Sequence, residues 1–259
     1  MQYAVLSSTA DLSYSFFLPI VCKLWRRLNF VPLVLLPSGD WDKPAAKFAL
    51  DSADAVLRVI GPIREYKLST AAQVGRLAAA SCEGIKPDDW LLTTDIDMFP
   101  FSKDCFRPWV SKRRFVVYGG DAYKGETRWP MCYIGAKAEE WRAAFKLKGP
   151  LTGDTSRLLR IGGKDNWNMD ERLAGRIIEN GMVEVLPRGW REGRALERQD
   201  RAAWSNKAGP YIDCHALRPG WEHWSKLSAV IRFHAPDVAD WADKYHKDFV
   251  AKFTPAGVV

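Results

Sequence analysis

The sequence predicts an α/β fold built on a mostly parallel sheet that is flanked by helices. Through the first 120 residues, short apolar runs alternate with helical patterns, as in successive strand–helix units. The run from Val31 to Leu36 is apolar throughout, which is typical of a strand buried on both faces of a parallel sheet. Of the 259 residues, 47% are apolar, so the chain can bury a large core and is too apolar for disorder.

The elements of the first half follow from local patterns. Strands are expected over 3–7, 31–36, 55–60, 90–94 and 115–119, and helices over 16–28, 43–52 and from Ser69 onward. Gly61-Pro62 ends one strand, and Ser69 or Thr70 is expected to cap the third helix. The second half is less regular, with a helix over 169–180 and a strand over 229–234. No repeat and no linker divides the chain, which indicates one domain with a Rossmann-like N-terminal half.

Charge and composition narrow the possible ligands and compartments. Lys and Arg total 38 against 31 Asp and Glu, a balance that favours anionic ligands. Five scattered cysteines without a CxxC pair indicate reduced thiols rather than a disulfide scaffold. Neither a signal-peptide pattern nor an apolar run of about 20 residues is present, so we expect a cytoplasmic protein without a transmembrane segment. Peripheral contact with a membrane stays open.

Two carboxylates directly follow one of the buried strands. The run Trp90 to Thr94 leads into Asp95-Ile-Asp97, and side chains two apart in an extended chain share a face. Ligands of α/β sheets bind beyond the carboxyl ends of strands, where these carboxylates would lie. Two like charges side by side need a cation, and oxygen ligands favour Mg²⁺ or Mn²⁺. The alternative is a solvated turn with two surface acids.

The segment TTDIDMFP resembles the DxD motif of the GT-A fold glycosyltransferases that use nucleotide sugars. It is similar to virally encoded and to glycogenin-like sugar transferases. The resemblance implies a single GT-A catalytic domain over 1–259, with a nucleotide-sugar-binding half (1–120) and an acceptor-side half (121–259). It also implies Mn²⁺, or Mg²⁺, held by Asp95 and Asp97.

The same resemblance implies donor-binding residues in the first half. The loop after the first strand would contact the nucleotide, and a helix before the DxD strand would present an arginine to the phosphates. The residues concerned are Ser8, Thr9, Asp11, Gln73, Arg76 and Asp95. Gln73 and Arg76 are three apart and so share a helix face. An ordinary turn and a solvated helical arginine are the structural alternatives.

Candidates in the second half concern the acceptor and the reaction. Asp121, Trp129 and Tyr133 would face the acceptor, although core packing explains the aromatic residues equally well. Asp170 or Glu171 would act as the general base on an acceptor hydroxyl. Asp170 is favoured because Asn168 and Glu171 fit a capping box, which would already occupy Glu171.

A late histidine would complete the metal site according to the resemblance. His234, at the end of the expected strand, is the first candidate, and His215 is its rival. Residues 187–201 contain five arginines and fit a basic lid over a pyrophosphate, a nucleic-acid patch or a solvated loop.

The sequence therefore predicts a metal-dependent glycosyltransferase of the hexosyltransferase type. It would move a sugar from a nucleoside-diphosphate sugar, a UDP-sugar in the first instance, to a hydroxyl of a glycan or glycolipid. A nucleotidyltransferase acting on sugar phosphates is the alternative, but the loop Ser7-Ser-Thr-Ala10 lacks the glycines of a phosphate loop. A nucleic-acid-binding protein is a second alternative. It is disfavoured because basic residues alternate with acids, so no nucleic-acid partner is expected.

Overall fold

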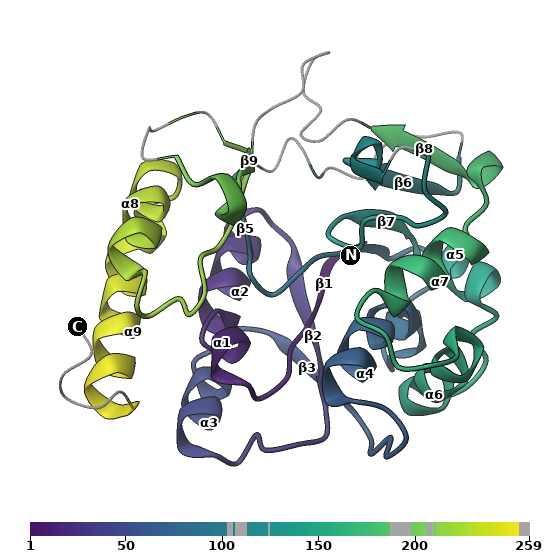
Figure 1. The fold of residues 1–259 in the computed structure, drawn as a ribbon, viewed down its shortest axis with the longest axis horizontal. Helices are drawn as coiled ribbons and strands as arrows, with labels where there is room; N and C mark the ends of the chain where they lie inside the picture. Colours follow the sequence, from purple (N-terminus) through teal and green to yellow (C-terminus); the bar gives the residue numbers. More distant parts are fainter. Residues whose placement is uncertain are drawn as a thin grey trace.

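The computed structural model describes residues 1–102, 106, 113–123, 125–186, 198–205, 209 and 211–253, with the side chains of 121 and 122 left out. Within these ranges the chain forms a central seven-stranded sheet with helices on both faces and a smaller sheet beside it (Figure 1). The central strands are β1 (Gln2–Ser7), β2 (Val31–Pro37), β3 (Val56–Ile60), β4 (Trp90–Thr93), β6 (Phe115–Tyr118), β7 (Ile134–Lys137) and β8 (Val183–Leu186). The smaller sheet contains β5 (Met98–Pro100), β9 (Arg198–Gln199) and β10 (Asp213–His215). The helices are α1 (Leu12–Ser15), α2 (Leu18–Arg27), α3 (Pro44–Asp51), α4 (Leu68–Gly75), α5 (Ala138–Phe145), α6 (Leu151–Gly162), α7 (Met169–Ile177), α8 (Trp224–His234) and α9 (Pro236–Phe253).

The central sheet is mostly parallel, as predicted. Its order is β3-β2-β1-β4-β7-β6-β8. Strands β1 to β4 are parallel neighbours, β6 pairs in parallel with β8, and β7 runs against both β4 and β6. Strands from both halves of the sequence therefore share one sheet.

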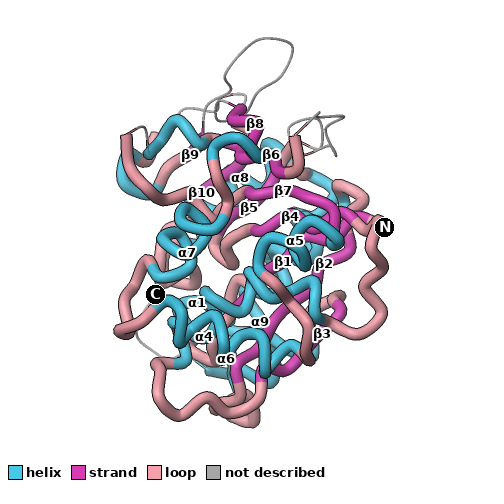
Figure 2. The backbone as a smooth tube through the Cα atoms, turned by 90° about the vertical axis from the view of Figure 1, so that its right-hand side faces the viewer, coloured by secondary structure: helices cyan, strands magenta, loops and turns pink. Residues whose placement is uncertain are grey.

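Alternating side chains of the strands build a core on each face of the sheet. In β1, Ala4 and Leu6 join one hydrophobic cluster, whereas Tyr3 and Val5 join the other. Helices α2, α8 and α9 cover the first face, and α4 to α7 cover the second, which faces the viewer in Figure 2. This two-sided burial explains the apolar run of β2.

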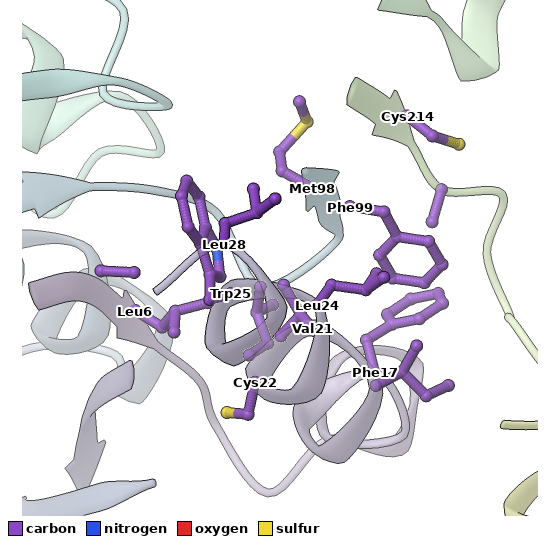
Figure 3. Close-up of a cluster of buried hydrophobic side chains, with 14 of the residues drawn as sticks. Leu6, Phe17, Val21, Cys22, Leu24, Trp25, Leu28, Met98, Phe99 and Cys214 are labelled. Atoms are coloured by element: carbon purple, nitrogen blue, oxygen red, sulfur yellow. The ribbon is translucent and has the colours of Figure 1, made fainter. Parts of the chain in front are cut away.

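Helix α2 holds the smaller sheet in place beside the central sheet (Figure 3). Its face lies beside Leu6 of β1 and against Phe99 of β5, and β10 pairs with β5 so that Cys214 lies opposite Phe99. Strand β10 runs antiparallel to β5 and places His215 opposite Met98. The segment that contains Asp95 and Asp97 thus connects β4 of the central sheet to β5 of the smaller sheet.

Several predictions about elements are wrong. Residues 229–234 lie in helix α8, where Trp224, Leu227 and Ile231 are buried at helical spacing. A short apolar run alone does not distinguish a strand from a buried helix. Helix α4 begins at Leu68 after Lys67, and the Thr70 hydroxyl donates to Asp165 rather than capping the helix. Helices α5, α6 and α9 were not predicted.

The four described cysteines, Cys22, Cys82, Cys132 and Cys214, are free thiols. Cys105 lies outside the described residues. Among the described helices, none combines the length and apolarity that a bilayer crossing needs.

Candidate active site

A cavity of about 320 Å³ lies beyond the carboxyl ends of β1 and β4. This is the edge at which parallel α/β sheets bind ligands. Residues from both halves of the chain line it, and they include these predicted site residues: Ser8, Thr9, Gln73, Arg76, Asp95, Asp97, Asp170 and Glu171. Asp11 does not line the cavity; its carboxylate caps α1 by accepting from Ser13 N at 2.8 Å.

The two aspartates of the acidic motif face different cations. Asp95 follows β4 and pairs with Arg76, whereas Asp97 lies in the turn before β5. The Asp97 carboxylate is 2.7 Å from Arg201 and 3.5 Å from both His215 and Arg218. Burial raises the pKa of Asp97, but His215, Arg201 and Arg218 outweigh it and hold that pKa below its ordinary value. Protein cations therefore neutralise both carboxylates.

Arg76 connects the acidic motif with helix α7. Its guanidinium donates to the carbonyl of Thr94 at 3.0 Å, to the Asp95 carboxylate and to Asp170 Oδ2 at 2.6 Å. The side chains of Arg76 and Asp170 are 6% and 2% exposed. Arg76 is therefore a buried clamp and not a solvated helical arginine.

Glu171 does not form the predicted capping box. Asn168 makes no side-chain cap on α7, and the Glu171 carboxylate accepts from Tyr123 Oη and from Arg128, each at 3.1 Å. Burial, and then the charge of Asp170, raises the pKa of Glu171. Burial also raises the pKa of Asp170, against the opposing effect of Arg76. The reason for preferring Asp170 over Glu171 as the base thus disappears.

His215, rather than His234, lies at the cavity. The pairing of β10 with β5 brings His215 Nε2 to 3.5 Å from Asp97 Oδ2. His234 ends α8 and stacks on Phe101, with ring centroids 4.6 Å apart, and it does not line the cavity. The prediction from the resemblance, that a late histidine at position 234 completes the metal site, therefore does not match the structure: residues 229–234 form part of helix α8 and not a strand that ends at the cavity.

The acidic motif and the adjacent His215 offer oxygen and nitrogen ligands for a divalent metal ion. Within the described ranges, no group of three or more His, Cys, Asp and Glu side chains is close enough to hold an ion without help. Asp97 and His215 supply a carboxylate and an imidazole 3.5 Å apart, and Asp95 adds a second carboxylate on the same cavity wall. Because Mg²⁺ and Mn²⁺ often take remaining ligands from substrate phosphates, this set fits such an ion.

Two of the predicted acceptor residues, Trp129 and Tyr133, do not line the cavity. Trp129 donates to the carbonyl of Ile178 at 3.0 Å, and Tyr133 is buried against Trp25 and Phe106. Both therefore follow the core-packing alternative. The side chain of Asp121 lies outside the described part of the structure.

Other residues at the cavity were not predicted. Trp167 is 58% exposed, and Tyr14 lies under the guanidinium of Arg218 at 4.6 Å. An aromatic residue between Asn166 and Asn168, just before a helix, was the signal for Trp167. Of the arginine-rich segment, 187–197 lies outside the described residues; Arg198 is buried on Asp213 at 2.7 Å, and Arg201 contacts Asp97.

Comparisons with known proteins concern the fold alone. No protein-family model matches the sequence, and no curated protein matches it. Among solved structures, the galactosyltransferase LgtC, in complex with donor and acceptor sugar analogues, is 13% identical with a TM-score of 0.49, covering 99% of this chain and 97% of its own. A mutant of Drosophila β1,4-galactosyltransferase 7, with manganese, UDP-Gal and xylobiose, is 8% identical with a TM-score of 0.43, over 83% of this chain and 71% of its own. The 4-diphosphocytidyl-2C-methyl-D-erythritol synthase of Anaerococcus prevotii is 13% identical with a TM-score of 0.42, over 76% and 92%.

Proposed function

We propose that this chain is a metal-dependent glycosyltransferase that moves a sugar from a UDP-sugar to a hydroxyl of a glycan or glycolipid. One observation carries the proposal. Two aspartates, a histidine and an arginine–carboxylate clamp line one cavity at the carboxyl edge of the sheet, although they come from residues 76 to 215. The resemblance of the acidic segment to a DxD motif supports the same reaction class.

The donor would occupy the wall built by the first half of the chain. Ser8 and Thr9 follow β1 and offer hydroxyl and backbone groups to a nucleoside. Gln73 Oε1 is buried in this wall without a hydrogen-bond partner in the described residues, and a sugar hydroxyl would satisfy it. Arg201 and Arg218 lie beside the acidic motif and suit a diphosphate, since guanidinium groups bind phosphate oxygens in pairs.

Asp95, Asp97 and His215 would hold Mn²⁺ or Mg²⁺. The ion would stabilise the diphosphate that leaves from the sugar, as a Lewis acid. Arg201 and Arg218 contact the same Asp97 carboxylate, and their side chains are 31% and 25% exposed, so they have room to turn from Asp97 to the phosphates. Arg76 keeps Asp95 and Asp170 in fixed positions.

The carboxylates of α7 would act on the acceptor hydroxyl. The Glu171 side chain is 16% exposed against 2% for Asp170, and its raised pKa brings it nearer to that of a useful base. We therefore propose that Glu171 receives the proton of the acceptor hydroxyl, while Tyr123 and Arg128 orient its carboxylate. Asp170, which Arg76 holds in place, would provide a carboxyl group beside the reacting sugar.

We also propose that residues 1–259 form a single catalytic domain. In this domain, residues 1–120 would bind the donor and residues 121–259 would bind the acceptor. A nucleotidyltransferase is not favoured, because the loop after β1 contains serine, threonine and alanine where a phosphate loop contains glycines.

Thermal denaturation with nucleotides tests the proposal. We expect UDP or a UDP-sugar with Mn²⁺ to raise the melting temperature, because a ligand at about 100 times its Kd stabilises the native state by about 2.7 kcal/mol. Asp97→Asn should abolish the Mn²⁺-dependent part of the shift and the release of sugar from the donor. Asp240→Asn, which removes a carboxylate that is 90% exposed, is the matched control. No shift with any UDP or GDP compound would refute the proposal.

A further inference from the structure

A second cavity, of about 730 Å³, lies on the other side of the first turn of α7. Three structural segments form its walls: the loop 126–128, the end of α6 with Lys164, and one face of α7. On that face Asn168, Arg172 and Arg176 recur every four residues. Two glycines bring the walls close together. A Cβ on Gly175 would meet the carbonyl oxygen of Thr127 at 2.1 Å, and one on Gly162 would meet the Met169 sulfur at 2.5 Å.

The charge of this second cavity is strongly positive. Arg128, Lys164, Arg172 and Arg176 line it, and Glu126 is the one carboxylate among its lining residues. Arg128 already pairs with Glu126 and Glu171. The side chains of Lys164, Arg172 and Arg176 form no ion pair or hydrogen bond within the described residues. Three neighbouring cations without a counter-charge repel one another, and an anion bound between them removes that repulsion.

The second cavity adjoins the candidate active site. Asn168 lines both cavities. Arg128 lines the second cavity and donates to Glu171, which lines the first, so this ion pair links the two cavities. Helix α7 thus presents Asp170 and Glu171 to one cavity and Arg172 and Arg176 to the other. Arg201 and Arg218, beside the acidic motif, already suit the phosphates of the donor. The second cavity is therefore assigned to the acceptor.

We propose that this second cavity binds an anionic group of the acceptor, a phosphate or a carboxylate carried by a sugar next to the one that reacts. The inference rests on the proposed glycosyl transfer and names its acceptor class: acidic or phosphorylated glycans. Lys164, Arg172 and Arg176 bind the anion, Asn166 and Asn168 offer amide donors, and the reacting hydroxyl reaches Glu171. Neutral glycans lack this anchor.

Calorimetric titration of the holo chain, loaded with Mn²⁺ and UDP, measures this site without any turnover. The probes are glucose, glucose 6-phosphate, glucuronate and inorganic phosphate. We expect the two anionic sugars to bind at least 10-fold more tightly than glucose. Arg172→Gln with Arg176→Gln should remove that preference, and both side chains are exposed, so the variant is expected to fold. Arg160→Gln with Lys247→Gln, which deletes two exposed cations elsewhere, should keep it.

The outcomes separate this inference from the proposed function. Equal affinity for glucose and the anionic sugars, or equal loss in the control variant, would overturn it. Vesicles containing phosphatidylglycerol form a further arm, and binding of these vesicles that is lost in the Arg172→Gln/Arg176→Gln variant, without any binding of anionic sugars, would also overturn it. UDP binding is followed in every variant, so a failure of the donor site appears as loss of UDP binding and not as loss of the anionic preference.

Discussion

The burial of Asp170 sets a pH dependence at the level of single residues. Burial raises the pKa of Asp170, and the nearby charge of Asp95 adds to the rise, while Arg76 opposes it. A carboxyl whose folded pKa is raised binds its proton more tightly in the native state than in the unfolded state. Its stabilising contribution is complete below the unfolded pKa, about 3.9, and is lost as the pH rises through the higher folded pKa.

Asp170→Asn is therefore expected to remove this contribution from the pH dependence of the free energy of unfolding. The free energy of unfolding of the wild type, relative to that of the variant, should fall as the pH rises above about 4, because the amide of the variant does not titrate. Urea denaturation at half-unit steps from pH 4 to pH 7 measures the difference. Asp240→Asn, at a side chain that is 90% exposed, serves as control. An identical pH profile for Asp170→Asn and the wild type would contradict the assignment of the raised pKa to Asp170.

Single residues also show which parts of the candidate site local sequence patterns can predict. Asp95, Asp97 and Arg76 were found because they adjoin strongly patterned elements. Glu171 was misread, because a capping box is a local pattern and its real partners, Tyr123 and Arg128, lie more than 40 residues away. His215 gains its place through the pairing of β10 with β5, which no short-range pattern encodes.

At the level of elements, α6 and α7 each contain a glycine with different surroundings. A Cβ at Gly153 would meet only Pro150, at 3.7 Å, whereas a Cβ at Gly175 would overlap the backbone of residues 127 and 128. Gly153→Ala should stabilise the protein by about 0.4–1 kcal/mol through lower unfolded-state entropy. Gly175→Ala should destabilise it, because overpacking costs about 1–3 kcal/mol and outweighs the helical preference of alanine.

Urea denaturation of the two alanine variants side by side tests this contrast. Both substitutions are the same chemical change in a helix, so the sign of the effect reports the surroundings alone. Stabilisation by Gly175→Ala would mean that the loop 126–128 does not pack closely on α7.

The helices and strands differ in how accurately the sequence predicts them. Strands β1 to β4 were predicted to within one or two residues, since each is an apolar run ended by Gly, Pro or polar residues. The run from Ala229 to His234 predicts a strand because it is short and apolar, but in the structure it continues the apolar face of α8 that includes Trp224 and Leu227. Period and length together, over 11 residues, would have indicated the helix.

At the level of the whole molecule, α9 ties the end of the described chain to its beginning. Phe249 is fully buried against Phe16, with ring centroids 4.9 Å apart, and Tyr245 Oη donates to the carbonyl of Phe16 at 3.0 Å. Phe249→Ala should lower the free energy of unfolding by about 3–5 kcal/mol. Phe233→Ala, at a side chain that is 58% exposed, should change it by less than about 0.5 kcal/mol.

Thermal and urea denaturation of both phenylalanine variants provide the comparison. A small effect of Phe249→Ala would show that α9 docks independently of the core on this face of the sheet. The α/β architecture was predictable from alternating strands and helices, whereas the smaller sheet was not, because its strands are two or three residues long and pair only after the chain has folded.

The reversed strand β7 has a consequence for synthesis of the chain on the ribosome. By residue 93 the strands β3, β2, β1 and β4 are complete, but the outer edge of β4 has no partner until residue 137 completes β7. At about 5–20 residues per second, the intervening 44 residues (137 minus 93) take about 2–9 s to add. For that interval the nascent chain carries an open, apolar strand edge, which is a template for pairing with other chains and a target for chaperones.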